Sequence, residues 1–97
     1  MSRIKQFNQK LMTWFTYILR CADESLYTGI TIDVDRRLHE HNTDNKKGAR
    51  YTRARRPVSL VYQQVCEDRA SASRLEYQLK NLSRKQKLAL LKTGKNR

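Results

Sequence analysis

Five polar side chains in this sequence are of types that can act together on a phosphate group. They are two phenols, a guanidinium, an imidazole and a carboxylate: Tyr17, Tyr27, Arg37, His41 and Glu76. The planar fork of an arginine suits two non-bridging phosphate oxygens. An imidazole or a phenol can move a proton at a reacting water, although a phenol with its usual pKa of about 10 needs a nearby cation to do so.

Each of these residues also has an ordinary structural interpretation. Tyrosines in strands commonly pack in a core, and an arginine on a helix is commonly exposed. A histidine beside apolar helix residues is more often structural than catalytic. Glu76 is the only acid after Asp68, so it is equally typical of a salt-bridge partner in a basic segment. The elements that carry these side chains must therefore decide between the two interpretations.

Residues 15–42 predict a β-hairpin followed by a helix. The run FTYILRC is separated from LYTGI by four residues rich in turn formers, residues 22–25. Asp33 is a suitable N-cap for the helix that follows. Arg37 and His41, four residues apart, share one side of that helix, whereas His39 faces away. We expect this order to bring Tyr17 and Tyr27 within reach of Arg37 and His41.

The same residues resemble the signature of the GIY-YIG nuclease family. Phe15-Thr16-Tyr17 keeps only the tyrosine of the family's first triplet, and Tyr27-Thr28-Gly29 keeps the outer residues of the second. Arg37 follows at the family spacing, and Glu76 in the segment RLEYQLK matches the glutamate that the family carries on a later helix. The resemblance runs from about Trp14 to about Leu91 and is greatest to the small stand-alone bacterial members, the YhbQ-like group.

The resemblance implies a nuclease that depends on Mg²⁺ or Mn²⁺. Tyr17 would be the general base and Tyr27 would orient water or phosphate. Arg37 would stabilise charge on the phosphate, His41 would assist proton transfer and Glu76 would hold the metal. Mg²⁺ keeps several waters, so a single carboxylate is enough in principle.

Two smaller expectations accompany this set. Gly29 would stay small so that the backbone can approach substrate or a neighbouring helix. A zinc site is the alternative metal centre, but its four candidate ligands match no common zinc spacing, and we discount it. Those ligands are Cys21, Cys66, His39 and His41. We expect both cysteines to be buried free thiols instead.

The segment 43–57 predicts a basic loop next to this site. Between Lys46 and Arg56 it holds six lysines or arginines and no acid. A basic run is usually only a solvated surface, but tyrosine and threonine within it suit base stacking and phosphate hydrogen bonds. We expect nucleic-acid contacts from Lys46, Lys47, Arg50, Tyr51, Thr52, Arg53 and Arg55, and from Lys80 one turn after Glu76.

Composition limits the possible partners. A formal charge of +12 on 97 residues favours a polyanion, with nucleic acid ahead of an anionic membrane. The sequence contains no apolar run long enough to span a membrane and no signal-peptide core, so we expect a cytoplasmic protein. No dedicated protein partner is evident.

The remaining pattern predicts one α+β domain with a three-stranded antiparallel sheet, in the order β-β-α-β-α-α. Residues 58–66 predict a central or well-covered strand. Asp68 or Ser71 can cap the next helix, whose apolar stripe is Ala72, Leu75, Leu79 and Leu82. Residues 83–86 form a capping box for a last helix with Leu88 and Leu91 inside and Gly94 as its stop. Residues 1–13 would be a basic arm, 14–92 the domain and 93–97 a frayed tail.

Two functions follow as hypotheses. The first is a metal-dependent nuclease acting on DNA, or on RNA as a second substrate, in DNA repair or nucleic-acid processing. The second is a nucleic-acid-binding module that keeps the fold and cleaves poorly or not at all. The complete set of tyrosines, Arg37 and Glu76 favours the first. Larger family members carry a further asparagine where this chain has Lys87 to Ala89, which favours the second.

Overall fold

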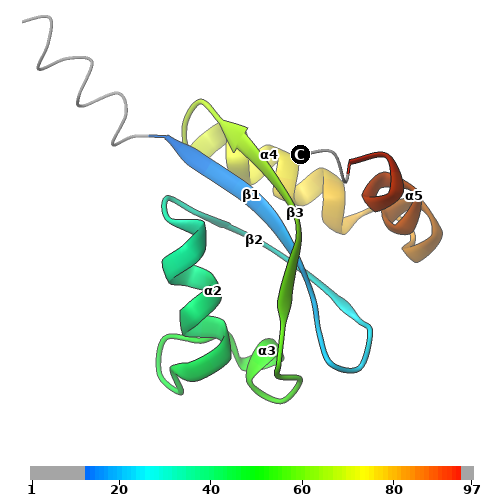
Figure 1. Cartoon of the computed structure of the whole chain (residues 1–97). Helices are drawn as coiled ribbons and strands as arrows, with labels where there is room; N and C mark the ends of the chain where they lie inside the picture. The colour runs from blue at the N-terminus through cyan, green and yellow to red at the C-terminus, as the bar shows by residue number, and fades with distance from the viewer. Residues whose placement is uncertain (1–12, 95–97) are drawn as a thin grey trace, which may run out of the picture.

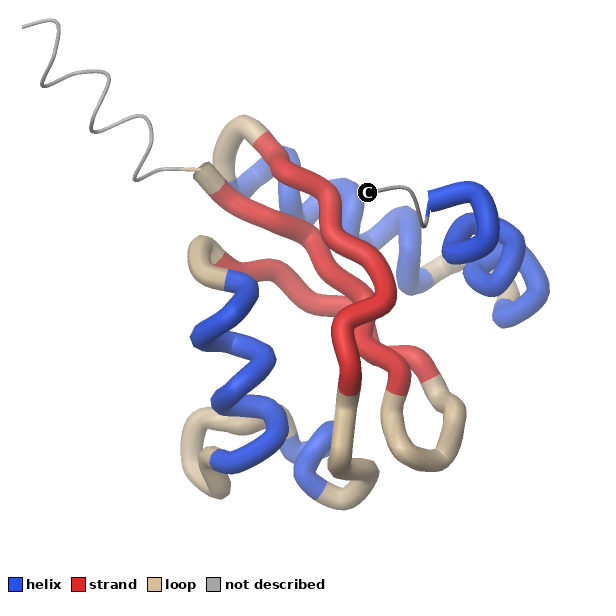
Figure 2. Tube along the Cα trace, viewed as in Figure 1, coloured by secondary structure: helices blue, strands red, loops and turns tan. Residues whose placement is uncertain are grey.

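The computed structural model describes residues 13–94, which form a three-stranded sheet with helices against it (Figures 1 and 2). In chain order the elements are β1 (Trp14–Arg20), β2 (Leu26–Thr31), α2 (Val34–Thr43), α3 (Arg50–Arg53), β3 (Ser59–Cys66), α4 (Arg69–Lys80) and α5 (Arg84–Gly94). The predicted α+β class and element order are confirmed, with the short helix α3 added inside the basic loop. Most of the predicted arm, and the end of the predicted tail, lie outside the described residues.

Strand β1 is the centre of the sheet, because β2 and β3 pair with its two sides in the order β2-β1-β3. Both pairings are antiparallel, and they place Tyr17 opposite Gly29 on β2 and Gln63 on β3. Side chains alternate along a strand. Phe15, Tyr17 and Leu19 therefore face one side of the sheet.

Strand β3 is an edge strand, so the prediction of a central or well-covered strand is wrong. Val65, for example, is 56% exposed. Apolar residues occur on both faces of β3 for a different reason. The pairing with β1 shifts between Ile18 and Leu19, so that Tyr62 and Leu60 both find partners and one residue between them is extra. Such a bulge reverses the alternation of faces and mimics the pattern of a covered strand.

Helix α4 covers the face of the sheet opposite Tyr17 and lies behind the sheet in Figure 1. The buried hydroxyl of Thr16 donates to the backbone oxygen of Ala72 at 2.9 Å. Ala72 is fully buried and its methyl allows this close approach, and Leu79 is buried on the same stripe. Asp68 accepts from the backbone nitrogen of Ser71 at 2.8 Å and caps the helix as predicted.

Helix α2 lies on the other face, where the core cluster contains Tyr17, Leu19, Cys21 and Val58. Leu38 of α2 packs against this cluster. Asp33 is the N-cap, since its carboxylate accepts from the backbone nitrogen of Arg36 at 3.0 Å. This fixed start sets the rotation of the helix and turns His41 towards Tyr17.

Helix α5 begins with the predicted capping box, in which Ser83 and Gln86 exchange hydrogen bonds of 2.8 and 3.1 Å. Leu91 is partly buried, but Leu88 is 41% exposed, contrary to the prediction that both face inward. Helix α5 contacts the sheet mainly through the edge strand β3. This contact covers only a narrow stripe of the helix surface.

Both cysteines are free thiols, as predicted, with Cys21 buried and Cys66 partly buried. Among the described residues, no helix combines the length and the apolar character needed to cross a membrane.

Candidate active site

A row of buried hydrogen bonds joins β1, α2 and α3. The hydroxyl of Tyr17 lies 2.8 Å from Nε2 of His41, and Nδ1 of the same ring lies 2.8 Å from the hydroxyl of Thr52. Thr52 in turn donates to the backbone oxygen of Ala49 at 3.0 Å. Tyr17 is 2% exposed, and His41 and Thr52 are fully buried. The imidazole therefore has a fixed partner at each nitrogen.

Tyr27 extends this row as an aromatic cluster. Its ring centre lies 5.1 Å from that of His41 in an edge-on arrangement and 5.9 Å from that of Tyr51, on which it stacks. The guanidinium of Arg55 lies 3.9 Å from the centre of the Tyr51 ring. The hairpin, α2 and the basic loop thus meet at one place, as the sequence led us to expect.

Gly29 makes room for Tyr17. A Cβ atom at position 29 would lie 2.5 Å from the Tyr17 hydroxyl and 2.7 Å from Cζ. The expectation that this space serves a substrate or a neighbouring helix is therefore wrong. The phenol ring from the paired strand fills it.

Arg37 is held next to Tyr17 by two acceptors. Its Nη1 donates to Glu40 Oε1 at 2.9 Å and to the backbone oxygen of Lys47 at 2.7 Å. A quarter of the Arg37 side chain remains exposed. Glu40 is not among the site residues predicted from the sequence. Its position three residues after Arg37 on one helix is the signal that could have identified it as a partner.

Burial dominates the electrostatics of the cluster. It raises the pKa of Tyr17 to about 12, with Tyr27 and Glu76 acting in the same direction and Arg37 opposing. Burial also lowers the pKa of His41 to about 4, and the positive charge of Arg37 adds to this. At neutral pH the phenol is therefore protonated and the imidazole is neutral.

Glu76 lies on α4, the helix that covers the face of the sheet opposite Tyr17. Its carboxylate is 24% exposed and pairs with Nζ of Lys80 at 3.2 Å. It lies near enough to Tyr17 for its charge to raise the pKa of that phenol. Within residues 13–94, no three acidic, histidine or cysteine side chains form a group that could hold a metal. A metal here would rely on one carboxylate and retained water, which fits Mg²⁺.

The structure divides the predicted nucleic-acid-binding residues into two groups. Lys46, Lys47, Arg50 and Arg53 are exposed, and Tyr51 is 37% exposed. Thr52 is fully buried, so the prediction that it contacts nucleic acid is wrong; its hydroxyl is directed to His41. Lys80 is exposed but paired with Glu76.

Two arginines of the basic loop stabilise its conformation. Arg55 pairs with Asp23 of the hairpin turn at 3.0 Å. Arg56 donates to the backbone oxygens of His41 and Asp44 at 2.7 and 3.1 Å. These contacts fix the loop against the hairpin and α2. Arg55 and Arg56 therefore have a structural role, which distinguishes them from the exposed cations of the same loop.

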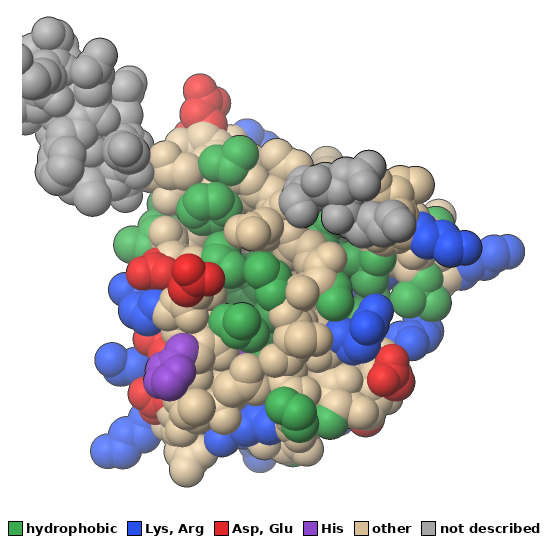
Figure 3. Space-filling model, in the orientation of Figure 1, with side chains coloured by type: hydrophobic (Ala, Val, Ile, Leu, Met, Phe, Trp, Pro, Cys, Tyr) green, Lys and Arg blue, Asp and Glu red, His purple; other side chains and the backbone are tan. Residues whose placement is uncertain are grey.

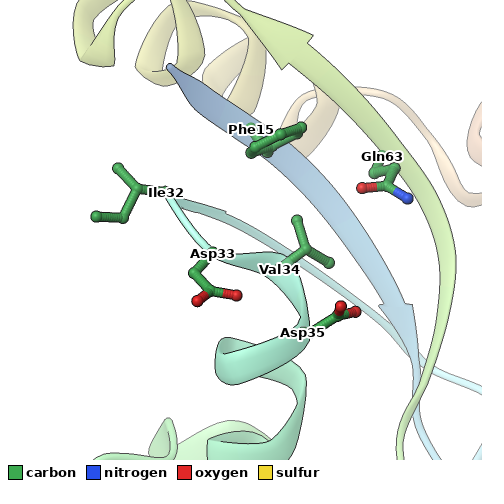
Figure 4. A pocket seen from close by; sticks show the side chains of 6 residues that line it. All are labelled: Phe15, Ile32, Asp33, Val34, Asp35 and Gln63. Atoms are coloured by element: carbon green, nitrogen blue, oxygen red, sulfur yellow. The ribbon is translucent and has the colours of Figure 1, made fainter. Parts of the chain in front are cut away.

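A shallow pocket of about 300 Å³ lies beside the cluster, on the same face of the sheet as Tyr17 (Figure 4). It is lined by Phe15, Ile32, Asp33, Val34, Asp35 and Gln63. Its two carboxylates make it unfavourable for phosphate. Figure 3 shows basic side chains around the margins of this view and hydrophobic ones near its centre.

The fold is a small α+β domain, and the side chains clustered on one face of its sheet are of types that can act on a phosphate group. The chain matches the model of the GIY-YIG catalytic domain over residues 13–89 and so belongs to the GIY-YIG family. This confirms the resemblance noted in the sequence and implies a nuclease-type function.

Its relatives are small stand-alone bacterial proteins named UPF0213. The chain is 56% identical to one from Desulfotalea psychrophila over 81 residues, covering 84% of this chain and 73% of that protein. It is 45% identical to one from Staphylococcus saprophyticus, covering 82% and 95%. The solution structure of a UPF0213 protein from Bacillus halodurans is 45% identical, with a TM-score of 0.55 and coverage of 84% and 85%. The solution structure of a protein from E. faecalis is 41% identical, with a TM-score of 0.57 and coverage of 84% of each chain.

Proposed function

We propose that this protein hydrolyses phosphodiester bonds, in DNA first and in RNA as a second substrate, within DNA repair or nucleic-acid processing. One observation carries the proposal. Tyr17 is hydrogen-bonded to His41 at 2.8 Å, beside a guanidinium that is itself oriented by Glu40 and Lys47. A core tyrosine would need neither an imidazole nor a partly exposed arginine as its neighbour.

In the proposed reaction Arg37 binds non-bridging phosphate oxygens, because its guanidinium keeps donors for them. Tyr17 takes the proton of the attacking water while the bond from water oxygen to phosphorus forms and the bond to the leaving oxygen breaks. A phenol with a pKa of about 12 is poorly suited to lose its own proton to water at neutral pH. His41 therefore serves as the group that accepts the proton that Tyr17 gives up. Tyr27, in edge contact with His41, orients the water or the phosphate.

Glu76 is the proposed ligand for Mg²⁺ or Mn²⁺. Its partial exposure and its isolation from other acids fit an ion that keeps most of its waters. When bound, such an ion supplies charge stabilisation at the leaving oxygen. Lys80 must release the carboxylate for the ion to bind.

The test compares purified protein with Glu76→Gln on labelled single- and double-stranded DNA and RNA, with Mg²⁺ or Mn²⁺. The variant is nearly isosteric, so we expect cleavage to be lost and binding to be unchanged or slightly tighter. Glu67→Gln is the matched control, since Glu67 is an exposed acid after β3. Undiminished cleavage in Glu76→Gln would assign the activity to another site or to a contaminant.

A nucleic-acid-binding module is the second candidate, and two observations favour it. Lys80 already neutralises Glu76, and the Tyr17 hydroxyl is almost completely buried. With a charge of +12, such a protein would bind polyanions without cutting them. Binding to all four substrates with no metal-dependent cleavage of any would establish this function in place of the nuclease.

A further inference from the structure

The tautomer of His41 can be worked out from its partners. A neutral imidazole donates from one nitrogen and accepts at the other. Both ring nitrogens face hydroxyl groups at 2.8 Å, so neither contact alone fixes the direction. Thr52 makes a further contact that does. Its hydroxyl lies 3.0 Å from the backbone oxygen of Ala49, and a carbonyl oxygen can only accept.

Thr52 has a single hydroxyl hydrogen, and the contact with Ala49 uses it. Towards His41 the threonine oxygen must therefore accept, and Nδ1 must carry the imidazole hydrogen. We propose that Thr52 is a positioning residue that fixes His41 as the Nδ1–H tautomer, so that an unprotonated Nε2 accepts the hydrogen of the Tyr17 hydroxyl. The catalytic consequence rests on the proposed nuclease function, whereas the tautomer itself does not.

The charges around the ring keep it neutral, which this assignment requires. Arg37 on α2 and Arg56 after α3 disfavour a second proton on His41, and Glu40 favours it. Burial outweighs Glu40. From β1 and β2, the phenol rings of Tyr17 and Tyr27 also face the imidazole.

The assignment gives the proton a defined route. As Tyr17 oxygen gains the proton of the water, its own O–H bond breaks and an N–H bond forms at Nε2. His41 becomes an imidazolium whose Nδ1–H bond stays directed at Thr52. With the opposite tautomer, Nε2 would already hold a hydrogen and could not accept one. Thr52 thus acts on the reaction only through His41.

The tautomer is measured by long-range ¹H–¹⁵N correlation spectra of the imidazole ring. The chain has two histidines, and the other one, His39, is exposed on α2. In the variant His39→Gln, all imidazole signals therefore come from His41. We expect a protonated Nδ1 and an unprotonated Nε2 in this background. Thr52→Val keeps the shape but removes the acceptor, and it should shift the ring towards the Nε2–H form. Thr52→Ser should restore the original pattern.

An Nε2–H tautomer with Thr52 present would overturn the inference, and this arm needs no substitution of Thr52. An Nδ1–H pattern that persists in folded Thr52→Val would overturn the role of Thr52. On DNA, Thr52→Val should lower the cleavage rate by about tenfold or more with unchanged binding, and Thr52→Ser should recover it. If no form of the protein cleaves while the tautomer behaves as expected, the nuclease proposal fails and the positioning role stands. If Thr52→Val changes the tautomer but cleaves at the normal rate, the proton route is overturned.

Discussion

Replacing Gly29 by alanine should displace Tyr17 from His41. The backbone at Gly29 does not have positive φ, so alanine is compatible with it and the effect is purely steric. The added methyl would lie 2.5 Å from the Tyr17 hydroxyl and 2.7 Å from Cζ. Ordinary contacts of this kind require about 3.5–4 Å. The ring must therefore shift by about 1 Å, which breaks the 2.8 Å hydrogen bond to Nε2 of His41.

Two costs add to give the magnitude. Overpacking a buried site destabilises by about 1–3 kcal/mol. Leaving a buried polar group without its partner costs about 1–3 kcal/mol more. We therefore expect a loss of about 2–6 kcal/mol in the free energy of unfolding. For a domain of this size, each 1 kcal/mol lowers Tm by about 4–8 °C.

The assay is urea unfolding of the two single variants Gly29→Ala and Tyr17→Leu and of the double variant. Leucine lacks the hydroxyl, Cζ and Cε2 atoms that the new methyl would meet. In the Tyr17→Leu background the alanine should be neutral or stabilise by about 0.4–1 kcal/mol, because it restricts the unfolded chain. An equal loss in both backgrounds would refute the steric argument and would locate the cost in the backbone of β2.

Two further predictions concern charge. Because the pKa of His41 is about 4 in the folded protein against 6.5 ordinarily, the unfolded chain binds more protons between these values. The contribution of His41 to the free energy of unfolding should be complete above about pH 6.5 and fall by up to about 3 kcal/mol towards pH 4. Measuring the free energy of unfolding at pH 4.5 and at pH 7 checks this, with His39→Gln as the control. The same loss in His41→Asn would contradict the prediction. Removing the exposed cations Lys46, Lys47 and Arg50 should make DNA binding less dependent on salt. The slope of the logarithm of the binding constant against the logarithm of the salt concentration should become shallower by about 0.9 for each lost phosphate contact. A triple variant of Arg84, Lys85 and Lys92 on α5 removes equal charge elsewhere, and an equal change there would exclude a specific role for the loop.

Local signals in the sequence are enough to predict the elements. Asp33 and Asp68 cap their helices through hydrogen bonds to residues only three positions further along the chain. The capping box of Ser83 and Gln86 spans the same short separation. The register of the hairpin follows from the turn and the alternation of its strands. Because the hairpin and the first long helix are adjacent in the chain, these local features also predict that Tyr17 and His41 lie close together.

The features that the sequence does not predict depend on contacts between distant segments. Thr52 lies eleven residues after His41 in the chain, and its hydroxyl contacts the imidazole. The basic composition of the loop between them predicts only that the loop is exposed to solvent. A bulge in β3 cannot be seen in β3 alone, because it exists only in the pairing with β1. The reason for Gly29 likewise lies on the neighbouring strand, where Tyr17 needs the space.

The proposed mechanism also has to account for a weak resting base. Burial keeps the pKa of His41 at about 4 in the free protein, and Arg37 is the largest charge effect that lowers it. A phosphate bound to Arg37 would offset that positive charge, so His41 becomes a stronger base when substrate is present. Glu40 orients the same guanidinium at 2.9 Å and acts on His41 in the opposite direction to Arg37. On this argument Arg37 both binds the phosphate and couples its arrival to the proton acceptor, which confines proton transfer to the substrate complex.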